Sequence, residues 1–113
     1  CALAAQDLAA FFADCAFANP PSLLEGAGAS REDMGALDRA VHDYITSMQA
    51  SLECITRTEA RLGEVLTAEQ RATVSNTYNN GVDQMKFVAD EYNRQVRYFR
   101  LSLEQYRSED IPR

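Results

Sequence analysis

The sequence predicts an all-α protein: a long, antiparallel, coiled-coil-like hairpin of two helices with an N-terminal helix and extended arm attached to it by a disulfide. Three observations support this fold class. Apolar residues recur every seven positions in two long stretches, a helix-start pattern separates the stretches, and Cys15 and Cys54 are placed so that the arm can meet the first stretch. We expect a single domain, with the arm in residues 1–29 and the hairpin in residues 30–113.

Length and composition exclude several classes of protein. A chain of 113 residues supplies one domain at most, and a hydrophobic content of 46% is too high for a disordered chain. A net charge of −6 disfavours binding to the phosphate backbone of nucleic acids. Because no run of about 18 apolar residues is present, we expect no membrane-spanning segment.

The N-terminal helix is expected over Leu3–Ala18. This stretch is rich in alanine, and its larger apolar residues fall mostly on one helical face. The pair Pro20-Pro21 ends the helix, because proline lacks a backbone donor and restricts the residue before it. Residues 22–29 include Gly26 and Gly28 and are expected to form an extended connector.

The first long helix is expected to begin at Ser30, which together with Asp33 resembles a capping box that has an acid in place of the usual Glu or Gln. Its apolar positions extend over more than four heptads, which predicts a helix that packs along its whole length on a partner. One half of the seam consists of Met34, Val41, Met48, Ile55 and Leu62, and the other half of Leu37, Ile45, Leu52 and Leu66.

The second long helix follows a second capping box, Thr67 with Gln70, and is expected to run from Ala68 to about Arg107. The turn signal Asn79-Asn80-Gly81 leaves two alternatives, a continuous helix or a break. We favour the continuous helix because the heptads keep their phase on both sides. The expected seam consists of Tyr78, Met85, Tyr92, Phe99 and Tyr106, with Val82, Ala89, Val96 and Leu103.

The short turn between the long helices requires them to run antiparallel. If the turn lies near Thr67, Arg97 lies opposite Asp38, and the neighbouring basic residues face the acidic start of the first helix. We therefore expect ion pairs between the helices to help fix their register. The groups involved are Arg94, Arg97 and Arg100 on one helix and Glu32, Asp33, Asp38 and Asp43 on the other.

The three cysteines lack the CxxC spacing of zinc and haem sites. Ser30 lies fifteen residues after Cys15, and this span is long enough to place Cys15 beside Cys54, which favours a disulfide; two unpaired buried thiols are the alternative. Cys1 is expected to be the lipid anchor of a mature bacterial lipoprotein. Ala2-Leu3-Ala4 instead resembles a signal-peptidase site, and both interpretations imply export.

From Cys15 onward the chain resembles small, mostly uncharacterised, exported helical proteins of alphaproteobacteria. The resemblance implies export and a hairpin carrying a disulfide, and it transfers no activity. It rests on Cys15 to Pro21; Gly28-Ala29-Ser30 with Met34 and Val41; Tyr44 and Cys54; and Tyr78-Asn79, Val82, Val88-Ala89, Tyr92-Asn93 and Gln95-Val96-Arg97.

No constellation of residues indicates catalysis. His42 is the single histidine and is expected on the surface, and the Glu-x-x-His pattern of di-iron bundles is absent. Gly26-Ala27-Gly28 lacks the rest of a phosphate-binding motif. We therefore expect a protein that is not an enzyme and that has no cofactor and no metal site.

The remaining hypothesis is a periplasmic interaction protein, an accessory or scaffold subunit of a membrane-associated complex. Phe11, Phe12 and Tyr98 are the candidate partner-binding residues, because they lie off the seam or on the arm. The alternative for Phe11 and Phe12 is that they cover the hairpin seam as part of a third helix. One alternative is a ligand site between the hairpin and the N-terminal helix, lined by Phe11, Phe12, Tyr92 and Phe99. Another is a homo-oligomer that forms a four-helix bundle.

Overall fold

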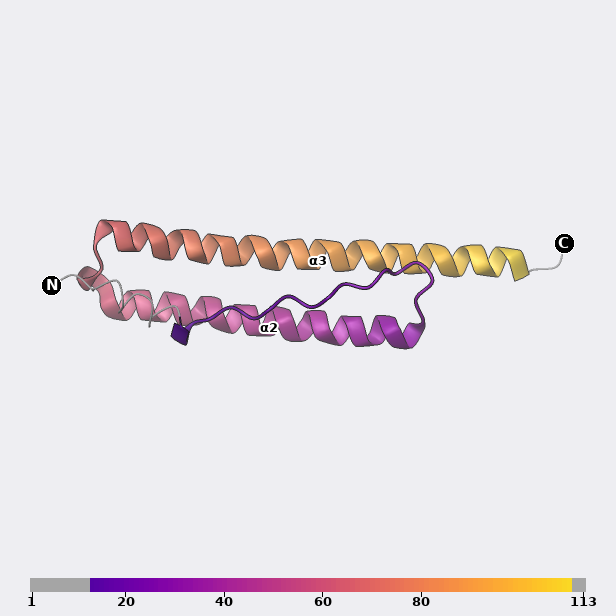
Figure 1. Ribbon diagram of the computed structural model, residues 1–113, viewed down its shortest axis with the longest axis horizontal. Coiled ribbons are helices and arrows are strands. Elements are labelled where there is room, and N and C mark those ends of the chain that lie inside the picture. Colours follow the sequence, from indigo (N-terminus) through magenta and orange to yellow (C-terminus); the bar gives the residue numbers. More distant parts are fainter. Residues whose placement is uncertain (1–12, 111–113) are drawn as a thin grey trace. The chain divides into compact units, whose positions relative to one another are not determined.

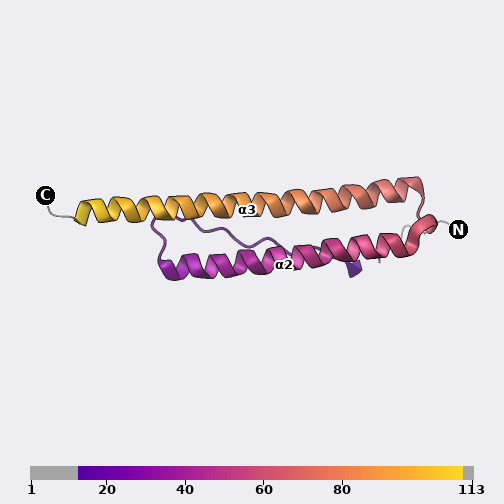
Figure 2. The same cartoon turned by 180° about the vertical axis from the view of Figure 1, so that it is seen from behind.

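The computed structural model describes the backbone of residues 13–110 and the side chains of residues 13–104 (Figures 1 and 2). Two long helices, α2 (Arg31–Leu62) and α3 (Ala68–Asp110), are joined by the short 3₁₀ helix η1 (Gly63–Val65). They pack against each other as the predicted antiparallel hairpin, and the described part of the chain contains no strand. The predicted all-α fold is therefore confirmed.

Both predicted capping boxes form. At the start of α2 the backbone N–H of Asp33 donates to the Ser30 hydroxyl (3.0 Å), and the N–H of Ser30 donates to the Asp33 carboxylate (3.4 Å). At the start of α3 the N–H of Gln70 donates to the Thr67 hydroxyl (3.0 Å), and the N–H of Thr67 donates to the Gln70 side chain (2.9 Å). Each box satisfies two backbone donors that a helix start leaves free.

Helix α3 continues through Asn79-Asn80-Gly81, so the continuous alternative is confirmed. Gly81 is buried, and a Cβ atom built on it would lie 2.5 Å from the tip of the Phe17 ring. The glycine therefore makes room for an aromatic ring from the arm. The two asparagines are exposed, where their low helix propensity is a small cost.

Most of the predicted heptad positions of α2 are buried, whereas Leu62 is half-buried. Tyr44 is buried, whereas Ile45, expected in the seam, is half-buried. Among the described side chains of α3 the buried positions are Val74, Gly81 and Val88, and Leu103, also expected in the seam, is 38% exposed. The seam of α3 was thus predicted on the face next to the buried one. The buried face is covered by the arm and carries smaller residues, and the heptad of aromatic residues beside it is the stronger sequence signal.

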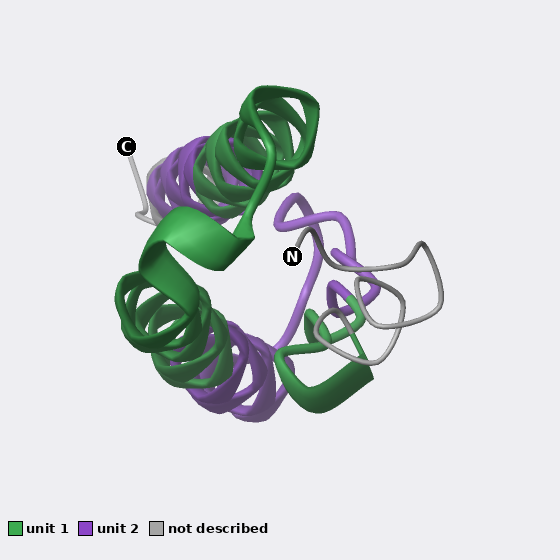
Figure 3. Cartoon of the chain, turned by 90° about the vertical axis from the view of Figure 1, so that its left-hand side faces the viewer, with its two compact units in different colours: residues 1–19, 45–85 green, residues 20–44, 86–113 purple. Residues whose placement is uncertain are grey.

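The chain divides into two compact units, each built from part of the arm and part of both helices (Figure 3). Unit 1 comprises residues 1–19 and 45–85, and one cluster of its buried core is formed by Cys15, Ile55 and Val74. Unit 2 comprises residues 20–44 and 86–113. The division into an arm (1–29) and a hairpin (30–113) stays a prediction.

The N-terminal segment leaves the helical conformation earlier than expected. Residues 13 and 14 are helical, whereas residues 16–25 have no regular secondary structure, so the helix predicted to reach Ala18 ends before Cys15. The reason is local: Cys15 is bonded to α2 and Phe17 packs on Gly81 of α3, and contacts with both long helices within three residues favour an irregular backbone over a helical one.

Candidate functional site

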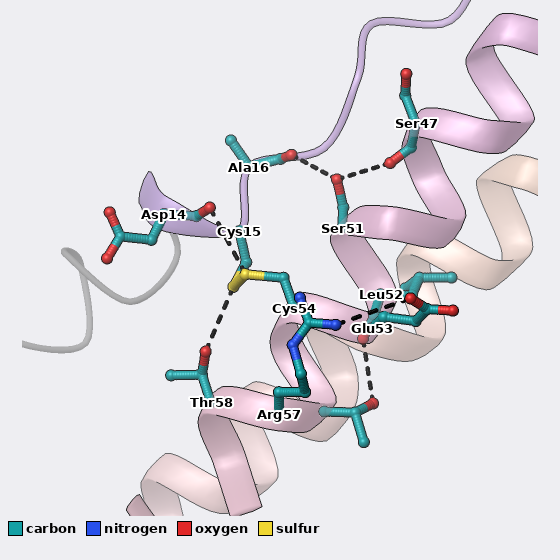
Figure 4. Close-up of a disulfide and its surroundings, with 11 residues drawn as sticks. Asp14, Cys15, Ala16, Ser47, Ser51, Leu52, Glu53, Cys54, Arg57 and Thr58 are labelled. Carbon is teal, nitrogen blue, oxygen red and sulfur yellow. Dashed lines mark hydrogen bonds and ion pairs between the residues drawn. A yellow bond between two sulfur atoms is a disulfide. The ribbon is translucent and has the colours of Figure 1, made fainter. Parts of the chain in front are cut away.

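The disulfide joins Cys15 of the arm to Cys54 of α2, with 5.5 Å between the two Cα atoms (Figure 4). Cys15 is buried, and its sulfur lies 3.7 Å from the Thr58 hydroxyl. The Ser51 hydroxyl donates to the backbone carbonyl of Ala16 (2.8 Å), one turn before Cys54. The predicted disulfide is confirmed, and a hydrogen bond beside it holds the arm to the same face of α2.

In unit 2 the arm is held to α3 by polar groups. The N–H of Gly26 donates to the Gln95 side chain (2.7 Å), and the N–H of Gly28 donates to the Ser102 hydroxyl (3.3 Å). A turn closes between them through a bond from the N–H of Ala29 to the carbonyl of Gly26 (3.1 Å). Gly28 has a φ of 79°, a backbone conformation that glycine adopts without strain.

One face of α3 carries large apolar side chains that the described residues leave uncovered. Phe87 is 64% exposed, Tyr98 is 44% exposed and Leu101 is 56% exposed. Their spacing of eleven and three residues places them on one helical face, together with the ion pair between Glu91 and Arg94. We call these five residues the α3 stripe.

Tyr98 thus occupies the exposed position expected of it. Phe87 and Leu101 were missed, although they lie off the predicted seam at the same helical phase as Tyr98, and that phase could have identified them. Phe11, Phe12 and Cys1, the other candidate contact and anchor residues, lie outside the described residues.

The ion pairs expected between α2 and α3 do not form among the described side chains. The two ion pairs of the described side chains, Arg57 to Glu53 and Arg94 to Glu91, join residues within one helix, and so does the contact between His42 and Asp38. The expected pairing of the α3 arginines with acids of α2 is wrong. Asp38 instead accepts a hydrogen bond from the Tyr92 hydroxyl (2.7 Å), because Tyr92, rather than Arg97, lies opposite it.

The buried and bonded environment of these tyrosines changes their acidity. Burial, the hydrogen bond to Asp38 and its negative charge raise the pKa of Tyr92 to about 12, and the Arg100 guanidinium acts in the opposite direction. Burial also raises the pKa of Tyr44. His42, as expected, is a surface residue.

Tyr92 and Phe99, two of the four residues expected to line a ligand site, do line one groove between α2 and α3. Within the described residues, no cluster of three or more histidine, cysteine or carboxylate side chains is arranged to hold a metal ion. None of the described helices has the length and apolar character needed to cross a bilayer.

Comparisons with protein-family models, with curated proteins and with solved structures find no match to this chain.

Proposed function

We propose that this chain is a non-enzymatic interaction protein of the bacterial periplasm, an accessory or scaffold subunit of a membrane-associated complex. The observation that carries the proposal is the α3 stripe, on which Phe87, Tyr98 and Leu101 expose large apolar side chains along one helical face. Large exposed apolar side chains that gather on one helical face are typical of a contact site for another protein.

The partner segment that fits the stripe is an amphipathic helix. Apolar anchors spaced at whole helical turns match the way one helix packs on another. Glu91 and Arg94 lie between the anchors and offer one negative and one positive charge. A partner helix whose charges oppose these two would gain orientation and register from them.

The disulfide supports the proposed location in the periplasm. Disulfides form and persist in oxidising environments such as the bacterial periplasm and are rare in the cytosol. A bond between the arm and α2 stabilises a fold whose core is thin. The resemblance to exported alphaproteobacterial proteins points in the same direction.

Site-specific photo-crosslinking tests the proposal in cells of the native host. A photoreactive phenylalanine replaces Tyr98 in one variant and Asn93, an exposed polar residue outside the stripe, in the matched control. We expect a crosslinked product only for position 98, which mass spectrometry identifies as a subunit of an envelope complex.

Two results would contradict the proposal. Equal crosslinking from positions 93 and 98 would show that the stripe has no preferred partner. Crosslinks from position 98 only to a second copy of the chain would show that the stripe forms a homo-oligomer instead.

A further inference from the structure

A groove in unit 2 lies between the start of α2 and the C-terminal half of α3. Its volume is about 430 Å³, which is within the range of small-molecule sites. Met34, Val96, Phe99 and Leu103 contribute apolar surface to it, and Arg31 and Arg100 contribute guanidinium groups. The groove thus combines an apolar wall with two positive charges.

The charge of this groove is opposite to that of the whole chain. The protein has a net charge of −6, yet no carboxylate lines the groove. Arg31 and Arg100 form no ion pair with the residues that the structure describes. The positive charge of Arg100 also reaches Tyr92 in the groove wall, where it opposes the rise in the pKa of that phenol. Two unneutralised guanidinium groups beside apolar surface favour an anion with an apolar body.

A second groove, in unit 1, provides a comparison within the same molecule. It has a volume of about 600 Å³ and apolar walls that include Leu52, Val82 and Met85. Its arginine, Arg57, is already paired with Glu53 (3.8 Å). The groove in unit 1 is therefore apolar but electrostatically balanced, whereas the groove in unit 2 is apolar and positive.

The polar groups at the two ends of the unit 2 groove give it a direction. At one end, the Tyr92 hydroxyl donates a hydrogen bond to Asp38. Asp38 lies seven residues after Arg31 along α2, which is about 10 Å of helix. A negative head group is repelled at the Asp38 end and attracted at the arginine end.

We propose that this groove binds a small, single-chain anionic amphiphile of the fatty-acid type, with its carboxylate between Arg31 and Arg100 and its chain on Met34, Val96 and Phe99. The apolar wall takes the hydrocarbon chain, and the guanidinium groups supply charge-assisted hydrogen bonds to the head group. This site is separate from the α3 stripe and does not depend on partner binding there.

The three methionines of the chain allow a direct test by NMR of ¹³C-labelled methyl groups. Met34 lines the groove in unit 2, Met85 lines the groove in unit 1, and Met48 is fully buried. Titration with dodecanoate below its micelle concentration is expected to shift the Met34 methyl signal in a saturable way. The Met85 and Met48 signals are expected to stay in place.

Two matched variants test whether a positive charge in the groove contributes to binding. Arg100→Gln removes a guanidinium from the groove and is expected to weaken dodecanoate binding about tenfold. Arg97→Gln removes the same charge from an exposed position of α3 that does not line the groove, and it is expected to leave binding unchanged.

Gly35 supplies a variant that closes the groove while the fold is kept. It lies on the groove wall, and a Cβ atom built there meets only the end of Arg39, at 3.8 Å. Gly35→Leu replaces a poor helix former with a good one and fills the groove, so it is expected to abolish the Met34 shift without loss of stability.

Any of four results would overturn the proposal. An equal Met34 shift with dodecyltrimethylammonium would show that charge plays no part, and an equal shift of Met85 would show unselective binding to apolar surface. Unchanged affinity in Arg100→Gln would remove the head-group site. Binding to vesicles of anionic phospholipid without any binding of free dodecanoate would assign the arginines to a membrane surface instead.

Discussion

At the scale of single residues, the Tyr44 hydroxyl is the most unusual group in the core. The side chain is 4% exposed, and its hydroxyl oxygen has no hydrogen-bond partner. A buried hydroxyl without a partner loses its bonds to water on folding and gains none in return. The ring of Tyr44 therefore stabilises the fold through packing, while its oxygen opposes folding.

We expect Tyr44→Phe to keep the free energy of unfolding unchanged or to raise it by up to about 1 kcal/mol, because the ring stays and the unpaired oxygen goes. Urea unfolding followed by circular dichroism measures the difference. A loss of more than about 1 kcal/mol would instead indicate a buried water that bonds to the hydroxyl.

Tyr92 gives the fold a dependence on alkaline pH. Its pKa of about 12 lies above the ordinary value of 10, so the folded state keeps the phenol proton over a range in which the unfolded chain releases it. The stabilisation is complete below about pH 10 and is lost as the pH rises towards about 12. The wild-type urea midpoint is expected to fall from about pH 9 to about pH 11.

Tyr92→Phe is the control for this pH dependence. The variant is expected to show a smaller fall in the urea midpoint over the same range, because the contribution of the Tyr92 phenol is removed and that of the raised pKa of Tyr44 remains. An equal fall in wild type and variant would show that Tyr92 does not hold its proton in the folded protein.

At the scale of the elements, the glycines show where side chains are excluded and where they are tolerated. A Cβ atom on Gly26 would overlap the backbone carbonyl oxygen of Gln95, so the arm could no longer lie against α3. Gly35, within α2, has open space around it and only lowers the helix propensity.

The two glycine-to-alanine variants are therefore expected to change the free energy of unfolding in opposite directions. Gly26→Ala is expected to lower the free energy of unfolding by about 1–3 kcal/mol through forced displacement of the arm. Gly35→Ala is expected to raise it by about 0.5–1 kcal/mol. Urea denaturation of both variants checks the pair, and a stabilising Gly26→Ala would contradict the close approach of the arm to α3.

The sequence predicts those elements whose signals are local and repeated. The capping residues Ser30 and Thr67 mark the starts of both helices. The apolar heptads predict α2 and α3 because every repeat places apolar residues on the same helical face. The face of α3 that meets the arm is harder to predict. It comprises Val74, Gly81, Val88, Gln95 and Ser102. These residues recur every seven positions, but some are apolar and others polar, so they form no hydrophobic pattern.

The predicted pairing of charges fails for a related reason. Sequence spacing places Arg97 near Asp38, but a shift of little more than one helical turn brings Tyr92 there instead. The length of the turn sets the approximate pairing of two helices, and only side-chain packing sets the final register. The candidate site follows the same rule: Tyr98 was identified from its phase, whereas the groove depends on packing between two elements.

At the scale of the whole molecule, the disulfide is the covalent link between the arm and the hairpin. It joins cysteines 39 residues apart, and such a bond restricts the unfolded chain. We expect the double variant Cys15→Ser/Cys54→Ser to lose about 2–4 kcal/mol of unfolding free energy. Urea unfolding under identical buffer conditions measures the loss, and wild-type stability in the double variant would contradict a stabilising role.

The central claim is an exported helical hairpin whose arm is fixed by the Cys15–Cys54 bond. The most direct measurement is intact mass and peptide mapping of the protein from its native host, alkylated before and after reduction. We predict that Cys15 and Cys54 resist alkylation until they are reduced and that a peptide pair linked through them is recovered. Free alkylation of both thiols without reduction would contradict the disulfide in the cell, and with it the argument for the periplasm.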